Sequence, residues 1–339
     1  MQTTTIGIDL AKSVFHVHGA DTRGRPVFSR RVSRCKLGEL IAKLPPCLSG
    51  MEACGSAHYW ARRFLELGHT VRLISPQFVK PFVKSNKNDR NDAEAICEAV
   101  SRPTMRFVAI KSVEQQDRQA LHRVRQRLIG QRTAVINQVR GLLAEYGIVV
   151  ARQPSSLRRR LPEILEDGEN GLSARARELF ARLYDELIQI QQRIEPIDLE
   201  IREIATQDEV CRRLQTVEGV GPLTATAVTA AVGDAGVFKN GRQFASYIGL
   251  VPRQHSSGGK QRLGRISKRG DTYVRTLLIH GAHTTVRWAR HKNTPRARWL
   301  MALVQRCGVQ KAVVALANKN ARVLWALMTR GEIYRSAVA

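Results

Sequence analysis

The first 105 residues alternate strand-like and helix-like stretches. Alternating apolar and polar positions rich in β-branched residues predict strands, and apolar positions three and four apart predict helices. The predicted strands cover residues 3–9, 14–20, 27–32, 48–52 and 70–74. The predicted helices cover residues 37–44 and 57–67, and another begins near Asn91. Three strands joined by short turns, followed by alternating helices and strands, are typical of a mixed α/β sheet of the ribonuclease H type.

From residue 117 to residue 206 the pattern is helical, with a polar interruption containing Pro and Gly at 147–172. After the interruption, apolar residues recur in alternating steps of four and three, the spacing of a coiled-coil seam. The seam consists of Leu183, Leu187, Ile190, Ile194, Ile197, Ile201 and Ile204. This stripe predicts a structural contact, either within the core or between subunits, and no chemistry.

These patterns predict α/β followed by all-α architecture in three domains. Residues 1–105 form the mixed-sheet domain, residues 106–209 a helical coiled-coil arm, and residues 210–335 a mostly helical, basic C-terminal domain.

The net charge then narrows the class of partner. The chain has 339 residues, 43% of them hydrophobic, so it can build packed cores. Lys and Arg number 55 against 29 Asp and Glu, a formal net charge of +26. A folded protein this basic is expected to bind a polyanion, because its cations release counterions from phosphates. It is a poor scaffold for a neutral small metabolite.

Two further observations bear on location. The longest apolar runs, such as residues 223–232, are too short to cross a bilayer, and the first ten residues lack a signal-peptide pattern. The six cysteines show no C-x-x-C pair, so we expect reduced thiols rather than zinc ligands or disulfides. Both favour a cytoplasmic protein without a membrane partner.

The charge is concentrated unevenly along the chain. Residues 111–162 carry eleven basic and three acidic side chains, and residues 163–209 carry five basic and thirteen acidic ones. Residues 252–311 carry fourteen basic side chains and one acidic one, half of the net charge. We therefore expect the last segment to be the strongest contact with a polyanion, the alternative being a solvated basic face.

Four carboxylates stand at positions suited to a metal site. Asp9 closes the first predicted strand in G-I-D-L-A-K, and Glu52 ends the fourth. Asp89 and Asp92 lie three apart at the start of a helix, so they share one face of it. If the first and fourth strands are neighbours, Asp9 and Glu52 meet at one sheet edge, where the helix could bring the other two.

Four carboxylates in one cleft repel one another unless divalent cations are present. They suit two Mg²⁺ ions, with Mn²⁺ as a possible substitute, because these hard cations take oxygen ligands and clamp attacking and leaving oxygens in phosphoryl transfer. Each acid alone is also typical of a turn or a helix N-cap, so the hypothesis depends on the ordered set.

The basic C-terminal domain contains two further motifs. V-E-G-V-G-P at 217–222 is typical of a helix-hairpin-helix, whose backbone amides hold a phosphate, and equally of a tight interhelical turn. S-S-G-G-K at 256–260 places serines beside glycines, which admit a phosphodiester, amid cations that stabilise attack on it. By itself such a loop is typical only of a flexible segment. The predicted nucleic-acid contacts are Lys12, Gly219, Gly221, Arg253, Lys260, Arg262, Arg265, Lys268, Arg269 and Arg275.

In this order and spacing, the motifs resemble the DEDD transposases of bacterial insertion sequences over nearly the whole chain. They are G-I-D-L-A-K at 7–12, M-E-A at 51–53, K-N-D-R-N-D-A at 87–93, the heptad arm, E-G-V-G-P at 218–222, G-L-V-P-R at 249–253, S-G at 257–258 and I-S-K-R-G at 266–270. Members of that family combine a RuvC-like N-terminal domain with a C-terminal transposase domain that bears a serine.

The resemblance implies a site-specific DNA recombinase. Asp9, Glu52, Asp89 and Asp92 then form a tetrad that binds Mg²⁺, and Ser257, or its neighbour Ser256, attacks DNA and forms a covalent phosphoserine link. The resemblance also implies a guide RNA encoded by the element, which pairs with target and donor DNA. It further implies a homodimer or homotetramer, in which the acidic cluster of one subunit completes the serine site of another.

Three rival interpretations stay open at this point. A metal-only junction nuclease would use the same tetrad with water as nucleophile. A non-catalytic nucleic-acid-binding protein would keep its carboxylates for structure alone. A sugar-kinase-like ATPase would use G-I-D followed by Lys12 as a phosphate loop, although the charge and the lack of a second glycine-rich loop disfavour it.

Overall fold

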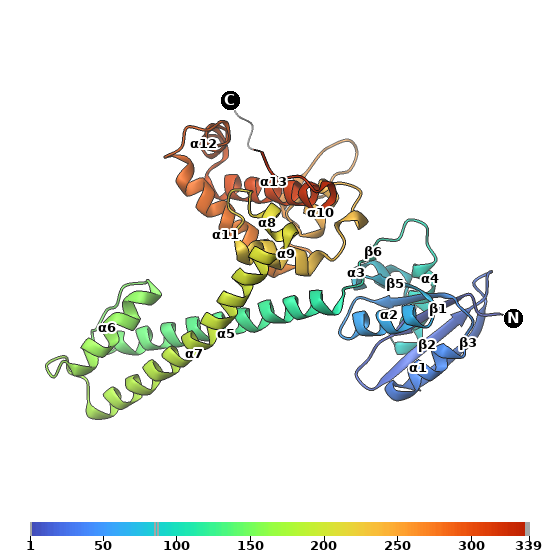
Figure 1. The fold of residues 1–339 in the computed structure, drawn as a ribbon, viewed down its shortest axis with the longest axis horizontal. Coiled ribbons are helices and arrows are strands. Elements are labelled where there is room, and N and C mark those ends of the chain that lie inside the picture. The colour runs from blue at the N-terminus through green and yellow to red at the C-terminus, as the bar shows by residue number, and fades with distance from the viewer. Residues whose placement is uncertain (1, 85, 87, 336–339) are drawn as a thin grey trace. The chain divides into compact units, whose positions relative to one another are not determined.

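The computed structural model describes residues 2–84, 86 and 88–335. The chain divides into two compact units (Figure 1). The first unit comprises Met1–Gln115 and Val232–Lys239, and the second comprises Gln116–Ala231 and Asn240–Ala339. The predicted boundary near residue 105 lies close to the first division, whereas the predicted boundary between 209 and 210 falls inside the second unit.

The first unit is built on a six-stranded mixed sheet with the strand order β3-β2-β1-β4-β5-β6. Its strands are β1 (Thr5–Asp9), β2 (Val14–Ala20), β3 (Pro26–Ser33), β4 (Leu48–Glu52), β5 (Thr70–Ile74) and β6 (Phe107–Val108). Strands β1, β4 and β5 are parallel, and the other neighbouring pairs are antiparallel. The expected mixed sheet is confirmed, and β1 and β4 are neighbours. Strand β6 was not predicted, because two residues are too short to show an alternation.

Helices cover both faces of this sheet. They are α1 (Arg34–Ala42), α2 (Ala57–Glu66), α3 (Pro76–Val79), the 3-10 turn η1 (Lys80–Phe82) and α4 (Asp89–Val100). On one face, Ile6 and Ile8 of β1 pack in a buried cluster with residues of α1 and α2, such as Ile41 and Phe64. Side chains alternate along a strand, so Gly7 and Asp9 face the other side, which α4 covers.

Two glycines allow α4 to lie directly against the sheet. A Cβ atom at Gly7 would come within 2.2 Å of the Ala93 carbonyl oxygen and 2.3 Å of the Cys97 amide nitrogen. A Cβ atom at Gly50 on β4 would come within 2.8 Å of Val100. These contacts seat α4 across β1 and β4.

This close packing predicts a strong effect of a single methyl group. Gly7→Ala is expected to lower the free energy of unfolding of the first unit by about 3 kcal/mol, because the helix backbone would have to move. Gly38→Ala in α1 is the matched control, since its Cβ would meet nothing within 4 Å and Ala is the better helix former. Urea titrations of both variants measure the difference. Equal stability of Gly7→Ala and wild type would contradict this seating of α4.

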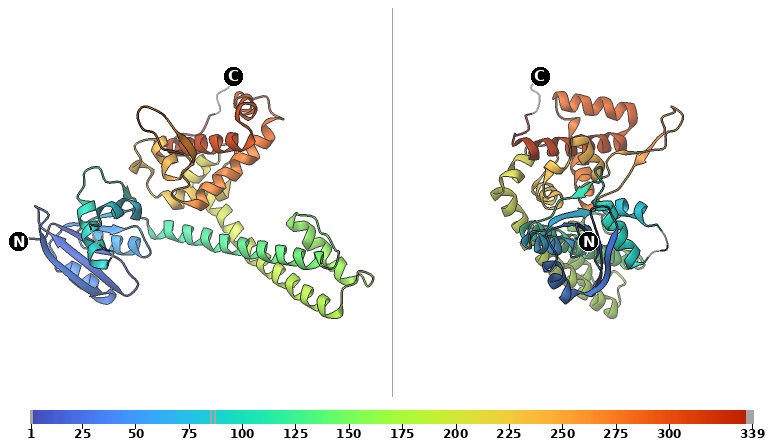
Figure 2. Two further views of the ribbon diagram at one scale, coloured as in Figure 1. Left: turned by 180° about the vertical axis from the view of Figure 1, so that it is seen from behind. Right: turned by 90° about the vertical axis from the view of Figure 1, so that its right-hand side faces the viewer.

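The second unit contains a long helical hairpin, of which the first three residues, 113–115, belong to the first unit. Its helices are α5 (Val113–Ala144), α6 (Pro154–Glu166) and α7 (Ala174–Gln207), and α5 and α7 lie side by side in Figures 1 and 2. They run antiparallel, joined by the ion pairs Arg118–Asp208 and Arg125–Asp198 and by the Arg132–Gln191 hydrogen bond. Helix α6 lies within the predicted interruption at 147–172, where Leu157, Leu161 and Ile164 form its buried face.

The predicted heptad seam is buried inside this hairpin. Leu187, Ile190 and Ile194 of α7 share one hydrophobic cluster with Val135 and Val139 of α5. This middle part of the stripe packs within the same chain, as predicted for a core contact, and a contact between subunits stays a prediction.

The rest of the second unit is mostly helical. It contains α8 (Glu209–Leu214), α9 (Pro222–Val232), α10 (Gly241–Tyr247), α11 (Thr272–Ala289), α12 (Pro295–Cys307) and α13 (Val309–Arg330), with the two-stranded hairpin β7 (Pro252–Gln254) and β8 (Leu263–Ile266). A short turn, η2 (Ala235–Val237), belongs to the first unit. Across the described part of the chain, no helix has the length and apolarity that a membrane span requires.

Candidate functional site

Two of the predicted acids end neighbouring parallel strands. Ile8 of β1 pairs with Met51 of β4, so the next residues, Asp9 and Glu52, end the two strands at the same edge. Both stand two positions beyond a glycine that faces α4, so strand alternation puts both side chains on the α4 side of the sheet. Both carboxylates are half-buried and both have interaction partners in the structure.

The start of α4 brings the other two acids toward this edge. Asn88 caps the helix, its side-chain oxygen accepting a hydrogen bond from the Asn91 amide at 2.9 Å. Asp89 precedes Ala93, which contacts Gly7 in β1, by four residues, so it lies one turn further along the same helix face. Asp92 precedes Ile96 by four residues and Val100 by eight, so it lies on the same helix face as Val100. Val100 in turn contacts Gly50 in β4.

The negative charges of these acids influence the pKa values of two neighbouring side chains. His16 pairs with Asp9 across β1 and β2. Its pKa is lowered mainly by burial, and Asp89 is the first charge that opposes this shift. The pKa of the Cys54 thiol is raised by partial burial and then by the negative charges of Glu52 and Asp9. Three of the four acids thus act on side chains at this edge.

Histidines on β2 are part of this face and were not among the predicted site residues. His16 and His18 alternate with the buried Phe15 and Val17, so they face α4. His18 is buried, and its Nδ1 atom makes no hydrogen bond within the described part of the structure. The V-F-H-V-H alternation could have shown that both histidines share a face with Asp9.

The donor chemistry of the edge fits a hard divalent cation, because its carboxylates offer oxygen ligands. Within the described residues, however, no three His, Cys, Asp or Glu side chains are grouped closely enough to hold a metal ion. Lys87 of the K-N-D-R-N-D-A motif lies outside the described residues. The tetrad as a metal site therefore stays a prediction.

The predicted nucleophile lies at the tip of the β7–β8 hairpin. Ser257 and Lys260 form a β-bridge, and the Lys260 amide donates to the Ser257 carbonyl at 3.0 Å. Gly258 and Gly259, the two residues between them, have φ angles of 56° and 75°. Two consecutive left-handed residues make a type I′ turn, which explains the glycine pair.

The two adjacent serines differ in their bonding. The Ser256 hydroxyl oxygen accepts hydrogen bonds from the Arg262 amide at 3.1 Å and the Gln254 side chain at 2.9 Å, which fasten the hairpin. Ser257 is exposed, and across the described residues its hydroxyl makes no hydrogen bond. The hydroxyl of Ser257 is therefore available at the tip, while that of Ser256 holds the hairpin together.

Exposed cations surround this hairpin. The side chains of Arg253, Lys260, Arg262, Arg265, Lys268 and Arg269 are all exposed, as is Lys12 after β1 in the other unit. Exposed cations on both sides of a hairpin suit contact with a phosphate backbone.

Arg275 has a structural role instead of the predicted contact. Only 6% of its surface is exposed, and its guanidinium donates to the Ile248 and Arg269 carbonyls, each at 2.9 Å, and to the Thr272 hydroxyl at 3.0 Å. It ties α11 to the ends of the hairpin segment. In the sequence, Arg275 is one cation among several in a basic segment. Only its burial in the folded structure distinguishes it from them.

The glycine turn between α8 and α9 also has a packing role. Gly219 has a φ angle of 85°, and a Cβ atom there would come within 2.7 Å of the Gly281 carbonyl oxygen in α11. Gly221 is exposed, and nothing would lie within 4 Å of its Cβ. Close packing against α11 thus accounts for Gly219, and phosphate binding by this turn stays a prediction.

Comparisons with known proteins find two family models that match different parts of this chain. The family model described as "Transposase IS116/IS110/IS902 family" matches residues 211–299, and the DEDD transposase model of the IS110 group matches residues 6–148. The chain is 54% identical over 336 residues to a probable family 20 transposase of Pseudomonas aeruginosa, covering 99% of each chain.

Two transposases named for their insertion sequences are also similar. The transposase for insertion sequence element IS1111A of Coxiella burnetii is 49% identical over 330 residues, which cover 97% of this chain and 91% of that protein. The transposase for insertion sequence element IS1328 of Yersinia enterocolitica is 41% identical over 331 residues, 98% of each chain. With its DEDD domain and this full-length similarity, the chain belongs to the IS110/IS116 family of insertion-sequence transposases.

Proposed function

We propose that this transposase cuts and rejoins DNA strands through a covalent link to Ser257. The observation that carries this proposal is the unbonded, exposed Ser257 hydroxyl at a glycine turn, next to a serine whose hydroxyl is used by the hairpin. The surrounding arginines and lysines would stabilise negative charge on the phosphate as it is attacked.

The bond changes balance without a further reactant. The Ser257 oxygen attacks the scissile phosphorus, its proton is lost to solvent or a base, and the bond to the leaving strand oxygen breaks as that oxygen is protonated. A hydroxyl of another strand then attacks the phosphoserine, which restores Ser257. Because one phosphoester replaces another at each step, no ATP is required.

Asp9, Glu52, Asp89 and Asp92 would hold Mg²⁺, or Mn²⁺ in its place. Such an ion polarises a phosphate and offsets the charge that develops on attacking and leaving oxygens. The placement of Asp9 and Glu52 at adjacent strand ends, with the start of α4 directed to the same edge, supports this assignment.

We also propose that an RNA encoded by the element guides the reaction and that the protein acts as a homodimer or homotetramer. The high net charge of +26 and the many exposed cations support an extensive contact with phosphate backbones. Base pairing would then read the sequence, and the protein would read backbone shape.

A denaturing gel tests the proposed function directly. Purified protein with its co-expressed RNA and Mg²⁺ is incubated with labelled DNA that carries the junction of the element. We expect labelled DNA to migrate with the protein as a covalent adduct, and chelation of Mg²⁺ to prevent this. Cleaved DNA without any adduct would instead favour the metal-only nuclease, in which water is the nucleophile.

Binding should depend steeply on salt. With roughly six to ten phosphate contacts, affinity for nucleic acid is expected to fall by about 10³–10⁵ between 50 and 200 mM salt, because each released counterion gains less entropy in a more concentrated salt solution. Fluorescence anisotropy of a labelled duplex measures this slope. A flat titration would contradict the polyanion argument.

A further inference from the structure

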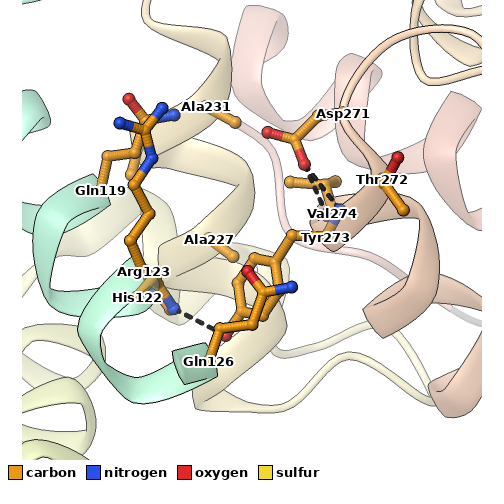
Figure 3. Close-up of a pocket in the computed structure, with 11 residues that line it drawn as sticks. Gln119, His122, Arg123, Gln126, Ala227, Ala231, Asp271, Thr272, Tyr273 and Val274 are labelled. Atoms are coloured by element: carbon orange, nitrogen blue, oxygen red, sulfur yellow. Dashed lines mark hydrogen bonds between the residues drawn. The ribbon is translucent and has the colours of Figure 1, made fainter. Parts of the chain in front are cut away.

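A pocket of about 330 Å³ lies between α5, α9 and the start of α11 (Figure 3). Helix α5 contributes Gln119, His122, Arg123 and Gln126, which lie three or four residues apart and so share one helix face. Helix α9 contributes Ala227, Ala230 and Ala231, and α11 contributes residues 271–274.

The face that α5 turns to this pocket is polar and partly exposed. Further along α5, the buried residues are apolar, such as Leu128, Val135 and Val139. Gln119, Arg123 and Gln126 lie on the opposite side of α5, and Arg123 and Gln126 are exposed. These side chains offer amide and guanidinium groups at the mouth of the pocket, where a ligand with polar edges could meet them.

A buried histidine with two hydrogen-bonding partners lies at the floor of the pocket. His122 is only 3% exposed, and its ring nitrogens lie 3.2 Å from the Tyr273 hydroxyl and 3.0 Å from the Thr226 hydroxyl. Burial lowers the pKa of His122 to about 4, so the ring is uncharged near neutral pH. These bonds hold the Tyr273 ring, which also lines the pocket.

The charges of the pocket disfavour a phosphate inside it. The Asp271 carboxylate accepts hydrogen bonds from the Tyr273 amide at 2.8 Å and the Val274 amide at 3.0 Å, so these amides of α11 are already used. The same carboxylate would repel an anion. Donors and acceptors stand on both sides, with Gln119, Arg123 and Gln126 facing Asp271 and Thr272 across the alanines (Figure 3).

We infer that this pocket receives an unstacked nucleobase of bound nucleic acid. A base has flat apolar faces, which suit the alanine wall and the Tyr273 ring, and a polar edge, which suits the two glutamines and Asp271. Arg123 at the exposed rim would contact the adjoining phosphate. The inference rests on the proposed function only in taking nucleic acid as the partner.

Short oligonucleotides that differ only in their bases test the inference on the full-length protein. Uridine and thymidine homopolymers are compared with abasic oligomers of equal length and charge by fluorescence anisotropy. Wild type is expected to bind a base-bearing oligomer about tenfold more tightly, the value of one stacked base. The RNA and DNA arms show which nucleic acid supplies the base.

Two variants and two controls locate the effect. Ala231→Leu, which fills the pocket, and Gln126→Ala are expected to remove most of this preference and to leave abasic affinity unchanged. Ala181→Leu and Gln192→Ala on α7, outside the pocket, should keep it. Photocrosslinking with a 4-thiouridine homopolymer should yield peptides containing His122 or Tyr273 in wild type and lose them in Ala231→Leu.

The outcomes separate this inference from the proposed function. An unchanged base preference in Ala231→Leu, or crosslinks found only on other peptides, would overturn the pocket and leave the phosphoserine chemistry untouched. Absence of binding to every oligomer, the abasic ones included, would overturn the polyanion contact on which both depend. The adduct gel measures the covalent chemistry of Ser257 separately from the base preference of the pocket.

Discussion

Ser257→Ala is expected to abolish the covalent adduct between protein and DNA, whereas Ser256→Ala is expected to retain it. Only the first change removes the hydroxyl that stands unbonded at the tip of the hairpin. The second removes an acceptor used by the Arg262 amide and the Gln254 side chain. Two neutral hydrogen bonds contribute about 1 kcal/mol each, so Ser256→Ala should loosen the hairpin and lower the adduct yield without abolishing the adduct.

The measurement is the fraction of labelled junction DNA that migrates with protein on a denaturing gel. Native gel shifts on the same preparations provide the control, because neither alanine changes the net charge and both variants should bind junction DNA like wild type. An adduct that persists in Ser257→Ala and disappears in Ser256→Ala would reverse the assignment of the nucleophile. Full cleavage by both variants would show that water, rather than a serine, attacks.

Asp9→Asn is expected to reduce strand cleavage by about 10³-fold or more while leaving DNA binding intact. Asparagine keeps the shape of the side chain at the end of β1 but removes the charge that a divalent cation requires. Loss of a metal's charge stabilisation costs several kcal/mol of the barrier, and each 1.36 kcal/mol is tenfold in rate. Asp185→Asn, an exposed acid on α7, is the matched control and should cleave like wild type.

A metal-replacement experiment distinguishes a ligand from a structural acid. Asp9→Cys should be inactive with Mg²⁺ and regain cleavage with a softer metal such as Cd²⁺, because thiolates prefer soft cations. Wild type is tested with Cd²⁺ as well, because the thiol of Cys54 already lies close enough to Glu52 and Asp9 to feel their charges. If Asp9→Asn retained full cleavage, the carboxylate would be structural, as the non-catalytic interpretation holds.

Local patterns were sufficient for most of the first unit. Strands β2, β4 and β5 follow the predicted bounds, because alternation of apolar and polar residues is a local property of a half-buried strand. The two residues of β6 are too few to alternate. Helix α6 was missed because its apolar face, Leu157, Leu161 and Ile164, is interleaved with arginines inside a polar stretch.

The sequence by itself determined the acids at the strand end and the helix start, the glycine-flanked serines and the basic character of the C-terminal part. Order along the chain carries this information, since motif spacing and net charge do not depend on packing. Only the tertiary structure decided which of two adjacent serines, or which of several neighbouring cations, has which role. Ser256 and Ser257 differ by the bonds that close a hairpin, and Arg275 differs from neighbouring cations by its burial.

The same holds for contacts between segments distant in sequence. The middle of the heptad stripe of α7 packs against α5, some fifty residues away in the sequence. His122 and Tyr273 are 151 positions apart, and only folding places them in one pocket. A residue's partners depend on which surfaces the fold brings together, and no local pattern encodes that choice.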